Sequence, residues 1–195
     1  YHEHTQTWSW WGSKCTTADE FIRFWQFTVE YLRDSKGVRN FIYAISPQMD
    51  TNYGDGVKAR LLHRWPGDDY VDFLGMDCYH WDNKNAFSSN LTAMSALSLE
   101  KKKPCGVTET GPEGFSWNNY WTDHILACAK DKRVSMIVMW RNKYVGGNES
   151  DRHFYSVYPG HPSESDFRTF YDDEATFFSK DLPDMYTMPK GYEVK

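Results

Sequence analysis

Apolar runs that favour β-strands recur along the chain at intervals of about 30 residues, the length of one strand–helix unit. Each run is almost continuously apolar, which is typical of strands buried on both faces of a parallel sheet. The runs cover residues 40–46, 71–79, 104–109 and 134–140, and we interpret residues 1–3 as the end of an earlier strand. The spacing therefore predicts an α/β fold with parallel strands.

Segments with helical spacing lie between these runs. The first opens with Thr17-Ala-Asp-Glu20, a capping box, and its apolar residues recur every three or four positions toward Gly37. The predicted helices cover residues 17–35, 88–100, 117–130 and 163–179. Such alternation predicts right-handed crossovers, in either an open doubly wound sheet or a (β/α)8 barrel. Because no glycine-rich phosphate-binding motif follows a strand, nucleotide binding has no support.

Composition narrows the range of functions. The formal net charge is −5, so we expect no nucleic-acid partner, and no apolar run approaches the length needed for membrane insertion. Aromatic residues make up 17% of the chain, and such rings often line clefts that bind sugars. The four cysteines form no CxxC pair and the histidines show no ligand spacing. We therefore expect no metal and no cofactor.

Polar and aromatic side chains gather at the carboxyl ends of the predicted strands, where α/β folds place their sites. Glu3 ends the first strand and Glu109 ends the fourth; Asp77, between them in sequence, is interpreted as a hydrogen-bond anchor. Two facing carboxylates with stacking rings suit glycoside hydrolysis, which needs one carboxyl protonated and the other ionised. Each glutamate alone could instead be a structural carboxylate paired with an arginine.

Four motifs together resemble glycoside hydrolase family 26, the β-mannanase family of clan A. They are Tyr1-His-Glu-His-Thr-Gln-Thr-Trp-Ser-Trp-Trp-Gly12, Asp77-Cys-Tyr79, Val107-Thr-Glu-Thr-Gly111 and Met139-Trp-Arg-Asn142, in the order and spacing of that family. The resemblance implies a (β/α)8 TIM barrel, of which this chain covers roughly the fourth to eighth strands. Residues 1–195 would be part of one catalytic domain, with an irregular tail over 180–195.

The resemblance implies a catalytic pair. Glu3 would be the general acid/base and Glu109 the nucleophile. Tyr79 would hold Glu109 in position by a hydrogen bond, and His2 would help to bind sugar at the cleavage subsite. From the residues alone, His2 could equally be a buried core histidine.

The resemblance also implies sugar-binding residues on both sides of that pair. Trp140 would form the stacking floor of the −1 subsite, with Arg141 and Asn142 supporting it. Trp8 would stack in an aglycone subsite. We interpret residues 10–11, both tryptophan, as packing residues.

The expected activity is that of a retaining endo-β-1,4-mannanase acting on β-mannan or a related polysaccharide by double displacement. The alternatives are another family-26 β-glycanase (a mixed-linkage β-glucanase, a β-1,3-xylanase or an exo-mannobiohydrolase) and a non-catalytic carbohydrate-binding barrel. Because such polymers do not cross membranes, we expect a secreted or cell-envelope protein.

The length of the chain bears on how the barrel is completed. A barrel of this kind usually needs about 250 residues, whereas this chain has 195. We therefore expect the C-terminal portion of a longer protein, with a missing N-terminal barrel segment needed to complete the fold. The portion alone would present open sheet edges and should aggregate and be poorly active.

Overall fold

The computed structural model of the protein describes residues 1–51, 53–143, 153–184, 187, 190 and 191. Its strands form one parallel four-stranded sheet in the order β1-β2-β3-β4. The strands are β1 (Ala44–Ile45), β2 (Phe73–Asp77), β3 (Cys105–Thr110) and β4 (Ile137–Met139). β1, β2 and β4 lie within runs that the sequence predicts to be strands, and β3 extends one residue beyond the predicted run 104–109. Parallel pairing places the carboxyl ends of the strands at one edge of the sheet.

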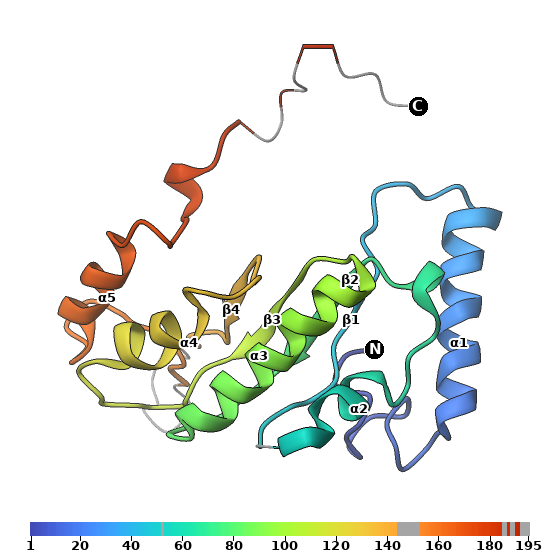
Figure 1. Cartoon of the computed structure of the whole chain (residues 1–195), viewed down its shortest axis with the longest axis horizontal. Coiled ribbons are helices and arrows are strands. Elements are labelled where there is room, and N and C mark those ends of the chain that lie inside the picture. Colours follow the sequence, from blue (N-terminus) through green and yellow to red (C-terminus); the bar gives the residue numbers. More distant parts are fainter. Residues whose placement is uncertain (52, 144–152, 185–186, 188–189, 192–195) are drawn as a thin grey trace.

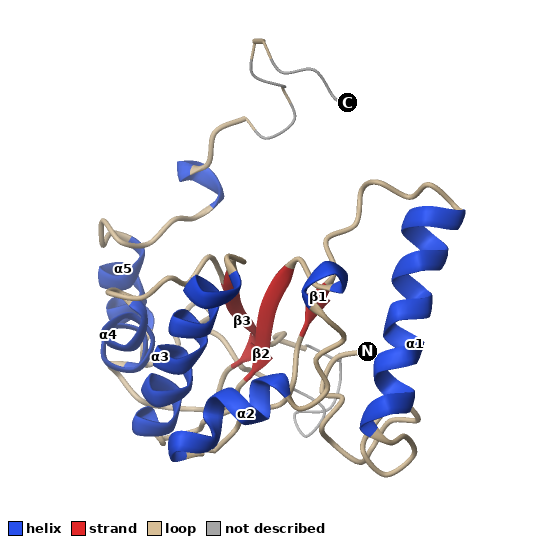
Figure 2. Cartoon of the chain, turned by 45° about the vertical axis from the view of Figure 1, so that its right-hand side comes forward, coloured by secondary structure: helices blue, strands red, loops and turns tan. Residues whose placement is uncertain are grey.

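The helices alternate with the strands, and the one over residues 57–62 was not predicted from the sequence. They are α1 (Ala18–Glu30), α2 (Val57–Leu62), α3 (Lys84–Lys101), α4 (Ala127–Ala129) and α5 (Glu164–Tyr171), with π-helical turns over Tyr31–Ser35 and Tyr120–Leu126. Figure 1 shows α1 and α5 toward opposite ends of the molecule, with α3 crossing in front of the strands. Figure 2 shows α2 and α3 on the near side of β1, β2 and β3.

Local sequence signals set the helix ends. The predicted capping box is present at α1, where the Thr17 hydroxyl accepts from the Glu20 N–H and Glu20 accepts from the Thr17 N–H. The helix predicted over 88–100 begins earlier, at Lys84, because the Asn83 side chain caps it. The helix predicted over 163–179 is shorter and ends at Tyr171, where the chain turns. Part of the predicted tail, at 185–186, 188–189 and 192–195, lies outside the described residues.

The prediction of a strand end at residues 1–3 is wrong. Glu3 has a φ of 48°, in the left-handed region, which interrupts an extended strand. The segment nevertheless lies beside β1, since the Glu3 N–H donates a 2.7 Å hydrogen bond to the Ser46 carbonyl oxygen. The N-terminal segment therefore reaches the sheet edge without forming a regular ladder.

The main core lies between the sheet and α3. Met94 and Leu97 of α3 are fully buried in one apolar cluster with Met76 of β2 and Val107 of β3. All five residues of β2 are buried, as expected for a strand covered on both faces. The four cysteines are free thiols, and only Cys15 is exposed. Among the described helices, none is long and apolar enough to span a membrane.

Candidate active site

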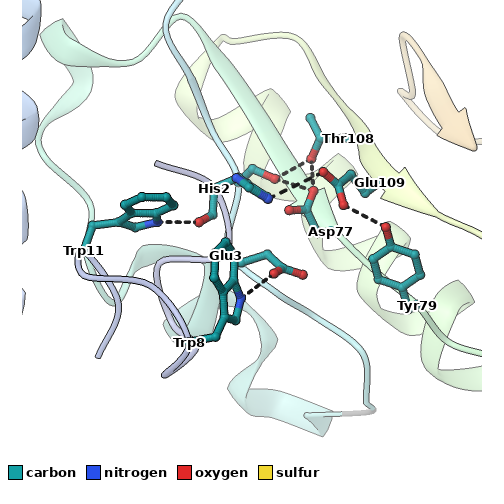
Figure 3. A network of polar contacts seen from close by, with 9 residues as sticks. His2, Glu3, Trp8, Trp11, Asp77, Tyr79, Thr108 and Glu109 are labelled. Carbon is teal, nitrogen blue, oxygen red and sulfur yellow. Dashed lines mark hydrogen bonds and ion pairs between the residues drawn. The ribbon is translucent and has the colours of Figure 1, made fainter. Parts of the chain in front are cut away.

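The ends of β2 and β3 bring Glu109 and Tyr79 together. Asp77 pairs with Glu109 in the sheet register, and the Cys78 N–H donates to the Glu109 carbonyl oxygen at 2.8 Å. Tyr79 comes directly after Cys78, and its hydroxyl donates a 2.7 Å hydrogen bond to Glu109 Oε2 (Figure 3). Burial, then this hydrogen bond, raise the pKa of Tyr79 well above its ordinary value. The phenol therefore keeps its proton and remains a donor to the carboxylate.

Glu3 reaches the same edge from the N-terminal segment. Its Oε2 accepts a 2.7 Å hydrogen bond from the Trp8 indole N–H. The Trp11 indole donates to the His2 carbonyl oxygen at 2.8 Å, which ties the segment back on itself. The left-handed backbone at Glu3 is a conformation that non-glycine residues adopt mostly where surrounding contacts hold it, and functional sites are enriched in such residues.

His2 connects the N-terminal segment to β3. Its Nε2 lies 3.6 Å from Glu109 Oε1, with the His2 side chain 42% exposed and that of Glu109 17% exposed. That exposure excludes the alternative of a buried core histidine. Figure 3 shows Glu3 and Glu109 at the same edge of the sheet, both beside Asp77. The two glutamates lie far apart in the sequence and therefore come together in one site only through the fold.

Asp77 anchors the strand ends, as the sequence predicts. It is 1% exposed, and its Oδ1 accepts 2.7 Å hydrogen bonds from the Ser46 and Thr108 hydroxyls. Burial raises the pKa of Asp77 to about 7, and the charges of Glu109 and Glu3 add to this, while the two hydroxyl donors oppose it. The carboxyl thus joins the ends of β1, β2 and β3 through side-chain contacts.

One group of possible metal ligands lies in this site. In the described part of the chain, His2, Asp77 and Glu109 each offer one ligand atom, and these atoms lie within 4.8 Å of one another. Hydroxyl groups already donate hydrogen bonds to Oδ1 of Asp77 and Oε2 of Glu109, so these two oxygens have partners without a metal. The expectation that the protein binds no metal stays a prediction.

The predicted residues after β4 lie further along the same edge. The Trp140 N–H donates to the Thr110 carbonyl oxygen at 2.7 Å, and the Arg141 guanidinium carbon lies 5.7 Å from the centre of the Trp140 ring. The Asn142 side chain holds a neighbouring loop. Its Oδ1 accepts from the N–H groups of residues 155 and 156, and its Nδ2 donates to the carbonyl oxygens of residues 156 and 157. Asn142 thus holds this loop in place, and its predicted support of Trp140 stays a prediction.

The contacts of the two glutamates weigh against a purely structural pairing. Within the described residues, their side-chain partners are Trp8 for Glu3, and Tyr79 and His2 for Glu109, with no arginine among them. Trp11 packs against the smaller core cluster, as predicted. Trp10 also packs its ring against Trp11 and Phe24, although it is 59% exposed.

Asp50 is a residue of this site that the sequence analysis missed. Its Oδ1 accepts a 2.8 Å hydrogen bond from the Tyr79 N–H. The signal that could have found it is position, since Asp50 follows the predicted strand 40–46 by only four residues. An acidic residue placed there reaches the same carboxyl edge as Glu109.

The fold and site define the barrel class of α/β protein, in which acidic side chains meet at the carboxyl ends of parallel strands. The chain belongs to glycosyl hydrolase family 26, whose sequence model matches residues 1–113. The matched range includes both Glu3 and Glu109.

Similar proteins agree with this assignment. A mannan endo-1,4-beta-mannosidase of Bifidobacterium adolescentis is 29% identical over 96% of this chain, and one of Caldalkalibacillus mannanilyticus is 28% identical over 73%. Among solved structures, a family-26 β-mannanase from Bacteroides ovatus superposes with a TM-score of 0.83 at 32% identity over 99% of this chain. A modular endo-β-1,4-mannanase from Cellulomonas fimi gives 0.78 at 30% identity over 94%. The predicted fold, part of a (β/α)8 barrel, is confirmed.

The matches also show how much of each relative this chain represents. It covers 54% and 42% of the two solved chains, and 20% and 27% of the two curated relatives. The chain therefore spans about half of a solved relative or less.

Proposed function

We propose that this chain forms the catalytic part of a retaining endo-β-1,4-mannanase. The observation that carries the proposal is the placement of Glu109, which Tyr79 holds by a hydrogen bond while His2 and Glu3 approach from the N-terminal segment. The naming of two relatives as mannan endo-1,4-beta-mannosidases supports mannan as the substrate. Activity and substrate are proposed for the whole protein, because the chain spans about half of a solved relative or less.

The proposed reaction takes two steps. In the first, Glu109 attacks the anomeric carbon, the bond from that carbon to the leaving oxygen breaks, and Glu3 gives its proton to that oxygen. In the second, water attacks the glycosyl-enzyme ester, gives a proton to Glu3, and releases the sugar with retained configuration. Tyr79 occupies Oε2 of Glu109, so Oε1 is the oxygen left to attack.

The polar residues around Glu109 serve this reaction by fixing its orientation before the substrate arrives. A carboxylate that must attack at one carbon benefits from positioning because bound reactants then need no further ordering. Trp8, which is exposed, and Trp140, which is half-buried, offer flat apolar faces on which sugar rings can stack. Export to the medium or the cell envelope is proposed on the size of the polymer alone.

Side-by-side digestion tests the substrate. The complete enzyme is incubated with mannan, galactomannan, lichenan and β-1,3-xylan, and product sizes are recorded over time. We expect rapid release of mixed oligosaccharides from the two mannans. Faster cleavage of lichenan or xylan would show that the substrate is another β-glycan and not mannan. Mannobiose as the sole early product would show that the enzyme is exo-acting and not endo-acting.

A further inference from the structure

Asp50 lies on a segment that continues β1 to the carboxyl edge of the sheet. The Met49 N–H donates to the Asp77 carbonyl oxygen at 2.7 Å. From α3, the Asn90 amide donates to the carbonyl oxygens of Met49 at 2.7 Å and Thr51 at 3.0 Å. Both neighbours of Asp50 are thus fixed by one buried side chain, so the carboxyl is held in a defined place.

The Asp50 carboxyl holds the backbone of Tyr79 in place. Its Oδ1 accepts the Tyr79 N–H at 2.8 Å, and its Oδ2 accepts a hydrogen bond from the Gln48 amide. The hydroxyl of the same tyrosine donates to Glu109. Asp50 therefore fixes the backbone of the residue that fixes Glu109.

Asp50 also lies in the electrostatic surroundings of Glu3. Burial raises the pKa of Asp50, and the charge of Glu3 raises it further, while the Tyr79 N–H, the Gln48 amide and the Arg60 guanidinium oppose this. Glu3 in turn lies close enough to Asp77 and Tyr79 for its charge to raise the pKa of each. The charged and titratable groups around this pair therefore come from the N-terminal segment, from α2 (Arg60) and from the end of β2.

We propose that Asp50 is a positioning residue for Glu109, which it holds in place through Tyr79. This inference rests on the proposed hydrolase function. Asp50 does not itself contact the sugar.

Two substitutions test this role. Asp50→Ala removes both the hydrogen bond from the Tyr79 N–H and the negative charge of the carboxyl. Asp50→Asn removes the charge but keeps an oxygen that can accept the Tyr79 N–H. The matched control is Asp72→Asn, because Asp72 likewise accepts a backbone N–H, from Tyr43 at 2.9 Å, at the opposite end of the same strands.

The experiment measures kcat and KM on mannan with the complete enzyme. We expect Asp50→Ala to lower kcat about 100-fold with little change in KM, because misplacing a reacting group costs about that much. We expect Asp50→Asn to recover most of this kcat, because it keeps an oxygen that accepts the Tyr79 N–H. Asp72→Asn should match the wild type in both kcat and KM.

Two results would overturn the inference: an Asp50→Ala kcat within about twofold of Asp72→Asn, or an Asp50→Asn kcat as low as that of Asp50→Ala. If Asp50→Ala does not fold, as judged by circular dichroism, Asp50→Glu decides, because its longer side chain displaces the Tyr79 backbone and a kcat equal to the wild type would overturn the inference. Failure of the proposed function looks different, because the wild type would then not cleave polysaccharide, or Glu109→Ala would cleave it equally fast.

Discussion

The Tyr79 hydroxyl and the Glu109 carboxylate meet across neighbouring strand ends at 2.7 Å. Tyr79 follows β2 and Glu109 lies in β3, so the parallel register of the two strands sets this contact. A neutral donor that burial keeps protonated can fix a carboxylate without neutralising its charge.

Tyr79→Phe should therefore lower kcat on mannan by about 10- to 100-fold, the value of one hydrogen bond to a charged group. The ring and its packing remain, so thermal stability should change little. Tyr70→Phe is the control, because Tyr70 donates an equivalent 2.7 Å hydrogen bond to Glu30 on α1, away from the site. Equal kcat values for the two variants would show that the Tyr79 hydrogen bond does not assist turnover.

Trp8→Phe should slow proton donation by Glu3, because it removes the indole N–H that orients that carboxyl while keeping an aromatic ring. We expect a loss of about tenfold on mannan and a smaller loss on an aryl mannobioside, whose leaving group needs little protonation. Trp10→Phe is the control, since Trp8 and Trp10 are each 59% exposed. Identical losses of activity on the two substrates would show that Trp8 does not assist proton donation by Glu3.

Asp77 should make folding stability depend on pH. Its pKa is raised to about 7 in the folded protein, against an ordinary value of 3.8, so the folded state binds the proton more tightly than the unfolded state. The stabilisation that comes from this tighter proton binding is present in full at pH values below the pKa of Asp77 in the unfolded protein. It is lost as pH rises toward 7. The loss reaches about 4 kcal/mol, at 1.36 kcal/mol for each pH unit.

Asp77→Asn removes this dependence while keeping an oxygen for the Ser46 and Thr108 hydroxyls. Urea unfolding at pH 4 and pH 8 compares the two proteins. Relative to the wild type, the variant should gain stability between the lower and the higher pH. A constant difference in unfolding free energy at the two pH values would contradict the assignment.

Residues 1–195 produced alone should be a poor enzyme. The described sheet ends at β1 and β4, and strands with unpaired edges readily pair with other chains. Light scattering and mannan hydrolysis of this segment, compared with the complete enzyme at equal concentration, check the expectation. A monomeric segment with full activity would show that the site needs no further strands.

The parts of the fold that repeat were predictable from the sequence. Apolar runs about 30 residues apart identify all four strands of the sheet, and Thr17 and Glu20 mark the start of α1 through their reciprocal hydrogen bonds. These signals are local, so they need no knowledge of distant contacts.

The parts of the site that depend on tertiary contacts were harder to predict. The left-handed Glu3 has no sequence signal, because its neighbours do not include a glycine that would suggest it. Asp50 looks like an ordinary loop residue until the β1 and β2 ends are placed side by side and its carboxyl meets the Tyr79 N–H. Likewise, the role of Asn142 emerges only when residues 155–157 return to the rim.

Trapping the glycosyl-enzyme tests the central claim most directly. The complete enzyme is treated with a 2-deoxy-2-fluoro-mannosyl fluoride, which slows release of the covalent intermediate, and the labelled peptide is identified by mass spectrometry. The account predicts a single sugar ester on Glu109, and no label in Glu109→Ala. A label on any other carboxylate, or turnover of mannan without a covalent intermediate, would contradict it.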